Sequence, residues 1–427
     1  MFIMRGGGAM KKGLPAALVL ALVLLSGCAA RATGEDAPPL CWPEQPVTLY
    51  VSSDLHWQPR AQAAGNDLLP EMVWLEEIID ALMDAAARDK PAALVLCGDL
   101  TNGGTLEEHE ALSARLGAAE AAGVNIFVTM GNHDMDRSVP PGTLKRLYGA
   151  FGWAEALSAD GGSMSYLAPV TDGLWLLSLD CNVYGEKESK LAGTVSTETL
   201  AWVEDCLERA AEAGVMVVPF SHHNLMVHTV DGDGRNYNID GGDALEDLLL
   251  SYGVPLYLSG HRHNSFLVEA ERDGRKLIEA VTDMPAAYPH RYTAITLQPD
   301  GTADYAVPSL DVDGWAARTG RSEPELLRFA EQSGARARAR LEDTAARVTE
   351  RMDAAQADRA EMERFYLDFY ACYQARTLWR EGDRLRADPG LALWRAHAGE
   401  NIYARWMPWI LEHQSDDAPV QTLGPFR

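Results

Sequence analysis

Short apolar runs alternate with helical patterns from residue 47 to about residue 310. Runs of strand length, rich in Val, Ile, Leu and aromatic residues, lie at 47–53, 92–97, 125–130, 174–179, 215–220, 255–259, 265–270, 276–281 and 292–297. Apolar residues three and four apart predict helices at 70–88, 105–121, 196–213 and 243–252. Strands that alternate with helices in this way predict an α/β fold.

The pattern becomes wholly helical after residue 311. The spacing predicts helices over about 323–348, 350–381 and 391–412, with a turn at Asp388-Pro389-Gly390 before the last. The chain therefore divides into an α/β domain, 47–310, and an all-α C-terminal domain, 311–427. We expect the aromatic residues of the second domain to pack its core: Phe365, Tyr366, Phe369, Tyr370, Trp379, Trp394, Trp406 and Trp409.

The first 27 residues have the pattern of an export signal. Arg5, Lys11 and Lys12 precede an apolar run of 12 residues at 14–25, which is too short to span a bilayer comfortably. The run leads into Leu25-Ser26-Gly27-Cys28, which resembles a bacterial lipobox. We expect 1–27 to be a lipoprotein signal peptide and 28–46 a tether. A plain secretory signal with an incidental Cys28 is the alternative, and Met10 is an alternative start.

This N-terminal pattern predicts a protein outside the cytoplasm, anchored to the bacterial cell membrane through lipidated Cys28. Export permits disulfides, but the five other cysteines (Cys41, Cys97, Cys181, Cys206 and Cys372) are too scattered to suggest a disulfide framework. Cys97 and Cys206 lie within apolar patterns and are expected in the core.

Acidic residues dominate the α/β part of the chain. Residues 28–310 hold 42 acidic and 17 basic side chains, whereas residues 311–427 hold 20 and 17. Because a nucleic-acid backbone is bound mainly by Lys and Arg, this balance argues against nucleic-acid partners and favours small soluble ligands. The sequence leaves the oligomeric state open.

Five short polar blocks follow predicted strands. They are Asp54-Leu55-His56, Gly98-Asp99, Gly131-Asn132-His133-Asp134, Ser221-His222-His223 and Gly260-His261-Arg262-His263. Carboxylates, imidazoles and an amide oxygen are ligands that Zn, Mn and Fe accept. In open α/β sheets functional residues gather at the carboxyl ends of the strands. A single block of this kind is more often a turn or a cap, but five in this arrangement indicate a metal site.

The five blocks resemble the signature of the calcineurin-like metallophosphoesterase family, and the resemblance covers roughly residues 47–300. It implies a two-sheet sandwich flanked by helices that holds two divalent or trivalent metal ions (Mn, Fe or Zn). It also implies seven ligands. These are Asp54, His56 and His263 for the first ion, Asn132, His222 and His261 for the second, and Asp99 as the bridge.

The resemblance places His133 beside the leaving group, where it either acts as a general acid or stabilises the transition state, and it gives Asp134 the role of orienting the His133 ring. The expected reaction is hydrolysis of a small phosphate ester, either a diester or a monoester, by a hydroxide that bridges the two metals. The alternatives are a metal-dependent nuclease on the same scaffold and a non-catalytic, ligand-binding surface lipoprotein.

Three other histidines have open roles. His223 either contacts substrate or is structural, and His228 and His290 likewise have either structural or substrate-side roles. The run 226–242, which is rich in glycine and polar residues, is predicted to be a mobile loop over the site.

Overall fold

The computed structural model describes residues 40–63, 70–136, 138–183, 191, 193–227, 237–413 and 418–426. The predicted signal peptide, Cys28 and most of the predicted tether lie outside these residues, as do His228 and the centre of the predicted 226–242 loop. Within the described residues, no helix has the length and apolar character needed to cross a bilayer.

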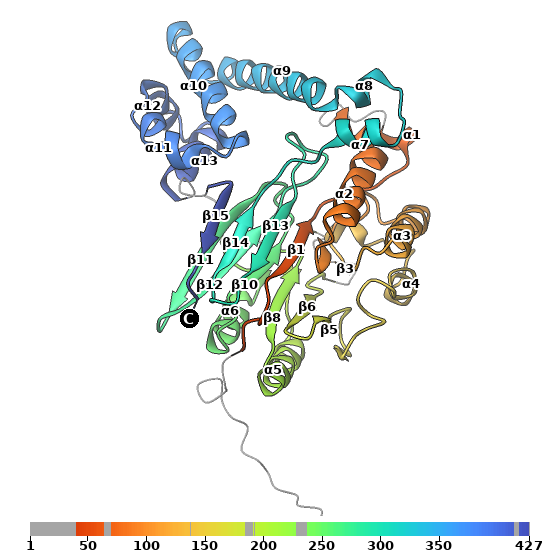
Figure 1. Cartoon of the computed structure of the whole chain (residues 1–427). Coiled ribbons are helices and arrows are strands. Elements are labelled where there is room, and N and C mark those ends of the chain that lie inside the picture. Colours follow the sequence, from red (N-terminus) through yellow and green to blue (C-terminus); the bar gives the residue numbers. More distant parts are fainter. Residues whose placement is uncertain are drawn as a thin grey trace, which may run out of the picture.

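Two β-sheets lie face to face at the centre of the molecule (Figure 1). The alternating direction of side chains along a strand explains how the first sheet is buried on both of its faces. In 92–97, Val95 and Cys97 belong to the core between the sheets, whereas Leu94 and Leu96 belong to a second core beneath helices. Because successive side chains point to opposite faces, a strand buried on both faces is a continuous apolar run.

The first sheet has a parallel centre and an antiparallel flank. Its order is β15-β14-β13-β1-β2-β3, in which β1, β2 and β3 run parallel. β13 runs antiparallel to β1, and β14 and β15 continue in alternating directions. The strands are β1 (Val47–Ser52), β2 (Ala93–Cys97), β3 (Ile126–Thr129), β13 (Thr293–Leu297), β14 (Ala303–Ala306) and β15 (Val420–Leu423).

The second sheet has the order β11-β12-β10-β8-β6-β5-β4, with β12, β10, β8 and β6 parallel. Its strands are β4 (Ser158–Ala159), β5 (Tyr166–Thr171), β6 (Leu174–Leu179), β8 (Met216–Ser221), β10 (Leu256–Ser259), β11 (Phe266–Arg272) and β12 (Arg275–Val281). The short strands β7 (Gly193–Thr194) and β9 (Ile239–Asp240) pair separately.

Helices flank both sheets (Figure 1). One group contributes to the core against the outer face of the first sheet: α2 (Leu75–Asp89), α3 (Leu106–Ala121), α4 (Pro141–Leu147) and α7 (Val312–Arg318). Another group packs on the second sheet: α5 (Thr197–Ala213) and α6 (Gly242–Ser251). The short elements α1 (Arg60–Ala63), η1 (Pro70–Trp74) and η2 (Asn132–Asp134) lie in connections. The two-sheet sandwich flanked by helices is thereby confirmed.

The C-terminal region is helical, as predicted, with its own buried cluster around Phe365, Phe369 and Trp394. Trp379, in contrast, is half exposed, so its predicted place in the core is wrong. The helices are α8 (Pro324–Leu327), α9 (Phe329–Glu350), α10 (Gln356–Gln374), α11 (Leu378–Arg386), α12 (Pro389–Ala396) and α13 (Ile402–His413).

The nine predicted strands are all present, with ends shifted by at most two residues. The sequence analysis missed β14 and β15 of the first sheet and β4 and β5 of the second. β15 follows the last helix and returns to pair with β14, so the end of the chain joins the α/β sandwich. Its four residues, Val420–Leu423, carry too short an alternation to distinguish a strand from a loop.

Candidate metal centre

The seven predicted ligands lie together beyond the carboxyl ends of five strands. They follow β1, β2 and β3 of one sheet and β8 and β10 of the other. Backbone bonds hold the first two loops to each other, because Asp54 N–H donates to Gly98 O and His56 N–H donates to Asp99 O. The parallel arrangement of the strands therefore brings together side chains that are as far as 209 positions apart in the sequence, from Asp54 to His263.

Asp54, His56 and His263 form the first cluster. Their ligand atoms lie within 4.8 Å of one another. The Nε2 atom of His263 is 3.2 Å from Oδ1 of Asp54 and 3.2 Å from Nε2 of His56. Asp54 and His56 are buried, whereas the side chain of His263 is 44% exposed. One side of this cluster therefore opens to solvent.

Asn132, His222 and His261 form the second cluster, which is buried. The Nε2 atom of His222 is 3.1 Å from Oδ1 of Asn132 and 2.9 Å from Nδ1 of His261. The other ring nitrogen of His222 lies 2.9 Å from the carbonyl oxygen of Cys97. Because a carbonyl oxygen only accepts, Nδ1 donates to it, and Nε2 is the ring atom that would face a metal ion.

Asp99 joins the two clusters. Its Oδ2 atom is 3.6 Å from Nε2 of His56 on one side and 3.2 Å from Nε2 of His222 on the other. Its Oδ1 atom accepts a hydrogen bond from the backbone N–H of His133 at 2.7 Å. A carboxylate in this position has the geometry of the predicted bridge.

The donor set fits two metal ions. The buried Oδ1 atom of Asp54 has no hydrogen-bond partner. The ring nitrogens of His56 and His263 point toward each other, and so do those of His222 and His261. Cations at these two points would satisfy the carboxylate and the facing lone pairs. Of the three described groups of residues that could hold a metal ion, two coincide with the predicted first and second sites.

The electrostatics of the centre favour a bound cation. Burial acts to raise the pKa of Asp54, but the His263 ring opposes it and the pKa falls to about 2. Burial lowers the pKa of His56 to about 4, against the opposing charge of Asp99. Burial likewise acts to lower the pKa of His222, but Asp99 raises it to about 9. The field of the buried carboxylates therefore stabilises positive charge between the rings.

Five of the seven residues have left-handed backbone conformations, which are uncommon for non-glycine residues. They are Asp54, His56, Asp99, His261 and His263, with φ between 45° and 68°. Such conformations cost about 1–3 kcal/mol each and persist where the surrounding structure imposes them. This concentration of strain marks the centre as a functional site independently of its residue types.

Two glycines of the sequence blocks permit the close approach of these loops. A Cβ atom at Gly131 would lie against the backbone nitrogen of Asp99, and one at Gly260 would lie against the hydroxyl of Ser53. Both positions are far inside van der Waals contact. The glycines are needed because the loops after β2 and β3 touch through their backbones, and because the loop after β10 lies directly against the side chain of Ser53 at the end of β1.

His133 lies beside the centre and is exposed. Its ring is 4.6 Å from that of His56, measured between centroids, and its Nδ1 atom is 2.8 Å from the carbonyl oxygen of Asn102. Nδ1 therefore donates, and Nε2 is left for a ligand. Sequence reasoning missed the part played by Asn102, because a backbone carbonyl leaves no mark in a residue pattern.

The orienting role predicted for Asp134 is wrong. Its carboxylate accepts hydrogen bonds from the backbone N–H groups of Leu100, Thr101 and Gly131 and from the Thr101 hydroxyl, at 2.8–3.1 Å. Asp134 is fully buried under the loops that follow β2 and β3. It holds these loops together, while the ring of His133 is oriented by Asn102.

Two histidines with open roles are buried. His223 packs against the rings of His222 and His261, with centroids 5.2 and 4.9 Å away, which favours the structural role. His290 contacts Pro285 O through Nδ1 at 2.9 Å and Ser333 Oγ through Nε2 at 2.6 Å. His290 thus joins the end of the α/β part to α9.

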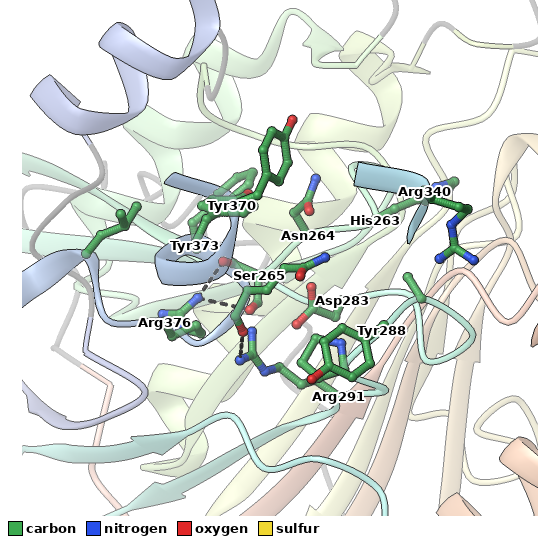
Figure 2. A pocket seen from close by; sticks show the side chains of 15 residues that line it. His263, Asn264, Ser265, Asp283, Tyr288, Arg291, Arg340, Tyr370, Tyr373 and Arg376 are labelled. Atoms are coloured by element: carbon green, nitrogen blue, oxygen red, sulfur yellow. Dashed lines mark hydrogen bonds between the residues drawn. The ribbon is translucent and has the colours of Figure 1, made fainter. Parts of the chain in front are cut away.

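A cavity of about 210 Å³ adjoins the first cluster. The loops that follow β10 and β12 form one side of it, and helices α9 and α10 form the other. Figure 2 shows Tyr370 and Tyr373 of α10 on one side, Arg340 of α9 on the other, and Asp283 between them. Tyr370 packs against the helical core, as expected from the sequence, and it also lines this cavity. We call the cavity the arginine pocket, defined by His263, Asp283, Arg291, Arg340, Tyr373 and Arg376.

Comparisons with known proteins identify a family profile and a curated relative that match this chain. The profile described as calcineurin-like phosphoesterase matches residues 47–265. A curated relative from Arcobacter nitrofigilis, named as a probable glycerophosphodiester phosphodiesterase, is 27% identical over 239 residues, which are 55% of this chain and 77% of the relative.

Solved structures with similar folds include a dimetal phosphatase from Danio rerio and a purple acid phosphatase from yellow lupin. The first has a TM-score of 0.48 and 15% identity, over 61% of this chain and 95% of the other. The second has a TM-score of 0.43 and 13% identity, over 64% of this chain and 53% of the other.

Proposed function

Because the chain belongs to the calcineurin-like phosphoesterase family and is a metal-dependent phosphoric ester hydrolase, we propose that it hydrolyses small phosphodiesters at a centre of two metal ions. One observation carries the proposal. The Oδ2 atom of Asp99 lies between two clusters of ligand atoms, with His56 on one side and His222 on the other. Two adjacent clusters that share a carboxylate are what a two-metal hydrolase requires.

The residues of the chain divide the work. Asp54, His56 and His263 would hold one ion, and Asn132, His222 and His261 the other, with Asp99 shared. Such ions, when bound, activate water and polarise the phosphoryl group. Asn102 holds the His133 ring beside the centre, so that Nε2 can stabilise the departing oxygen or give it a proton. The strained loops fix these groups before substrate arrives.

The preference for diesters rests on the likeness to the Arcobacter nitrofigilis protein, whose name specifies a phosphodiesterase. The test is hydrolysis of bis(4-nitrophenyl) phosphate and of 4-nitrophenyl phosphate by the purified protein with Mn, Zn or Fe added. Faster hydrolysis of the diester, abolished in a folded Asp99→Ala variant, supports the proposal. Faster hydrolysis of the monoester replaces it with a monoesterase. No turnover of either ester with metal bound would overturn it.

We also propose export and lipid anchoring, which rest on the Arg5–Cys28 pattern alone. Metabolic labelling with a radioactive fatty acid should label the wild-type chain but not a Cys28→Ser variant. Secretion of an unlabelled wild-type chain would identify a plain secretory signal instead.

A further inference from the structure

The arginine pocket is continuous with the metal centre. His263 belongs to both, because it contributes to the first metal-binding cluster and also lines the pocket. An ester with its phosphate at the metals would therefore extend past His263 into the pocket. Its opposite wall comes from α9 and α10, so the C-terminal helices shape what can bind there.

Basic side chains outnumber acidic ones in this pocket. Arg291, Arg340 and Arg376 line it with one carboxylate, that of Asp283. This contrasts with the surrounding part of the chain, in which residues 28–310 hold 42 acidic and 17 basic side chains. A local excess of positive charge within an acidic domain attracts an anionic group.

Neighbouring groups compensate these arginines only in part. Arg340 contacts Glu71 at 3.1 Å, but Arg336 shares the same carboxylate at 2.8 Å. Burial raises the pKa of Asp283, although Arg291 and Arg376 oppose the shift. Arg340 thus shares the Glu71 carboxylate with Arg336, and Arg291 and Arg376 share the charge of Asp283. Buried positive charge in excess of the nearby negative charge is costly, and an anionic ligand would reduce this cost.

Backbone contacts fix two of the guanidinium groups. Arg376 donates through Nη1 to the carbonyl and hydroxyl oxygens of Ser265, and Arg291 donates through Nη2 to the carbonyl oxygen of Gln374 (Figure 2). An arginine held in this way loses little further freedom when it binds a carboxylate or phosphate. The Tyr373 hydroxyl, which has no hydrogen-bond partner, adds a further donor to this wall.

The size of the pocket limits the group that fits. Its volume of about 210 Å³ is below the range of roughly 300–1,000 Å³ that is typical for drug-sized ligands. A short acidic alcohol is within the size of this space.

We propose that the arginine pocket binds a second anionic group, a carboxylate or a phosphate, on the alcohol part of the ester that the metal centre hydrolyses. The inference rests on the proposed function for the position of the ester phosphate. It makes the C-terminal helices a determinant of substrate specificity.

The test is the binding of four small phosphonates, which no hydrolase of this kind cleaves, to the metal-loaded protein by titration calorimetry. 3-Phosphonopropionate carries a carboxylate and ethane-1,2-diphosphonate a second phosphonate, whereas propylphosphonate and 2-aminoethylphosphonate carry an apolar and a cationic tail. We expect the two probes with an anionic tail to bind about tenfold or more tightly than the other two, because charge-assisted bonds to arginine are strong. Whichever of these two probes binds more tightly identifies the anion that the pocket prefers, a carboxylate or a phosphonate.

Variants distinguish the pocket from direct binding to the metals. Arg291→Gln should remove most of the preference for probes with an anionic tail, and Arg291→Lys should retain part of it. Arg340→Gln provides a second test, because the Arg340 side chain is 28% exposed and tolerates replacement better. The matched control is Arg380→Gln, a loss of charge at a half-exposed arginine of α11 that should leave all four affinities unchanged.

Equal affinities for the four probes, or a preference that survives both Arg291→Gln and Arg340→Gln, would overturn the inference. This binding test can succeed or fail independently of the hydrolysis test of the proposed function. A preference that Arg291→Gln removes in a protein that cleaves no phosphate ester would support the anion pocket and reject the phosphodiesterase.

Discussion

The Nδ1 atom of His133 lies 2.8 Å from the backbone carbonyl oxygen of Asn102, so the ring donates a hydrogen bond to the backbone and Nε2 is left for a ligand. Asn102 lies three residues after Asp99, on the loop that follows β2. The same loop therefore supplies the shared carboxylate and sets the orientation of the exposed histidine.

Replacing His133 should slow the reaction more for an ester with a basic leaving group, such as an alkoxide, than for one with a weakly basic leaving group. In a His133→Gln variant we expect kcat for an alkyl phosphodiester to fall by about 10²–10⁴-fold. The loss for a 4-nitrophenyl diester should be much smaller, because nitrophenolate leaves without a proton. His413→Gln, at an exposed histidine of α13, is the control. Equal losses for both esters would contradict a proton-donating role.

Replacing Asp99 should remove metal and activity together. Asp99→Asn retains the shape of the side chain but removes the charge that faces both clusters. We expect fewer than two metal ions per chain by elemental analysis and a fall of about 10³-fold or more in kcat/KM, which corresponds to several kcal/mol. The exposed Asp172→Asn is the matched control. Full metal content in a folded Asp99→Asn protein would exclude the bridge.

Asp134 should matter for stability as well as activity. The Asp134→Asn side chain keeps one acceptor oxygen, but it cannot accept all four hydrogen bonds from Leu100, Thr101 and Gly131. We expect a loss of about 2–3 kcal/mol in the free energy of unfolding, measured with denaturant on the metal-free protein. Unchanged stability with reduced activity would return Asp134 to the predicted catalytic role.

Two glycine substitutions should act in opposite directions. Gly131→Ala would place a methyl group against the Asp99 backbone and should destabilise the protein by about 1–3 kcal/mol or more. Gly117→Ala, inside α3 with open space around it, should stabilise the protein by about 0.5–1 kcal/mol. Midpoints of thermal unfolding measure both. A neutral Gly131→Ala protein would show that the loops can separate.

Glu71 should make the docking of α9 sensitive to acid. Its carboxylate is fully buried; burial acts to raise its pKa, but the hydrogen bond from Arg336 and the charge of Arg340 lower it overall. A carboxyl whose pKa is lowered by folding stabilises the protein above its unfolded pKa, 4.5 here, and this stabilisation disappears as the pH falls further.

Denaturation of the wild-type protein and of Glu71→Gln, measured from pH 7 to pH 3.5, tests this sign. The wild type should be more stable by about 2 kcal/mol at pH 7, and the difference should shrink as the pH falls below 4.5. A difference that is constant with pH would show that the ion pairs of Glu71 do not contribute.

The sequence by itself determined nine of the strands and a list of candidate metal ligands. Strands such as β2, buried on both faces, are continuous apolar runs, and a polar block at the end of such a run is visible without a structure. Asp54, Asp99 and His222 could be named because local patterns specify where a strand ends and which side chains follow.

Only the tertiary structure decided which groups face each other. The partner of the His133 ring is a carbonyl, the partners of Asp134 are backbone N–H groups, and Arg291 and Arg376 meet at a pocket from segments 85 residues apart. Contacts of this kind depend on how the sheets and α10 pack. Packing leaves no periodic trace in the sequence, because it depends on shape across elements and not on the order of residues within one.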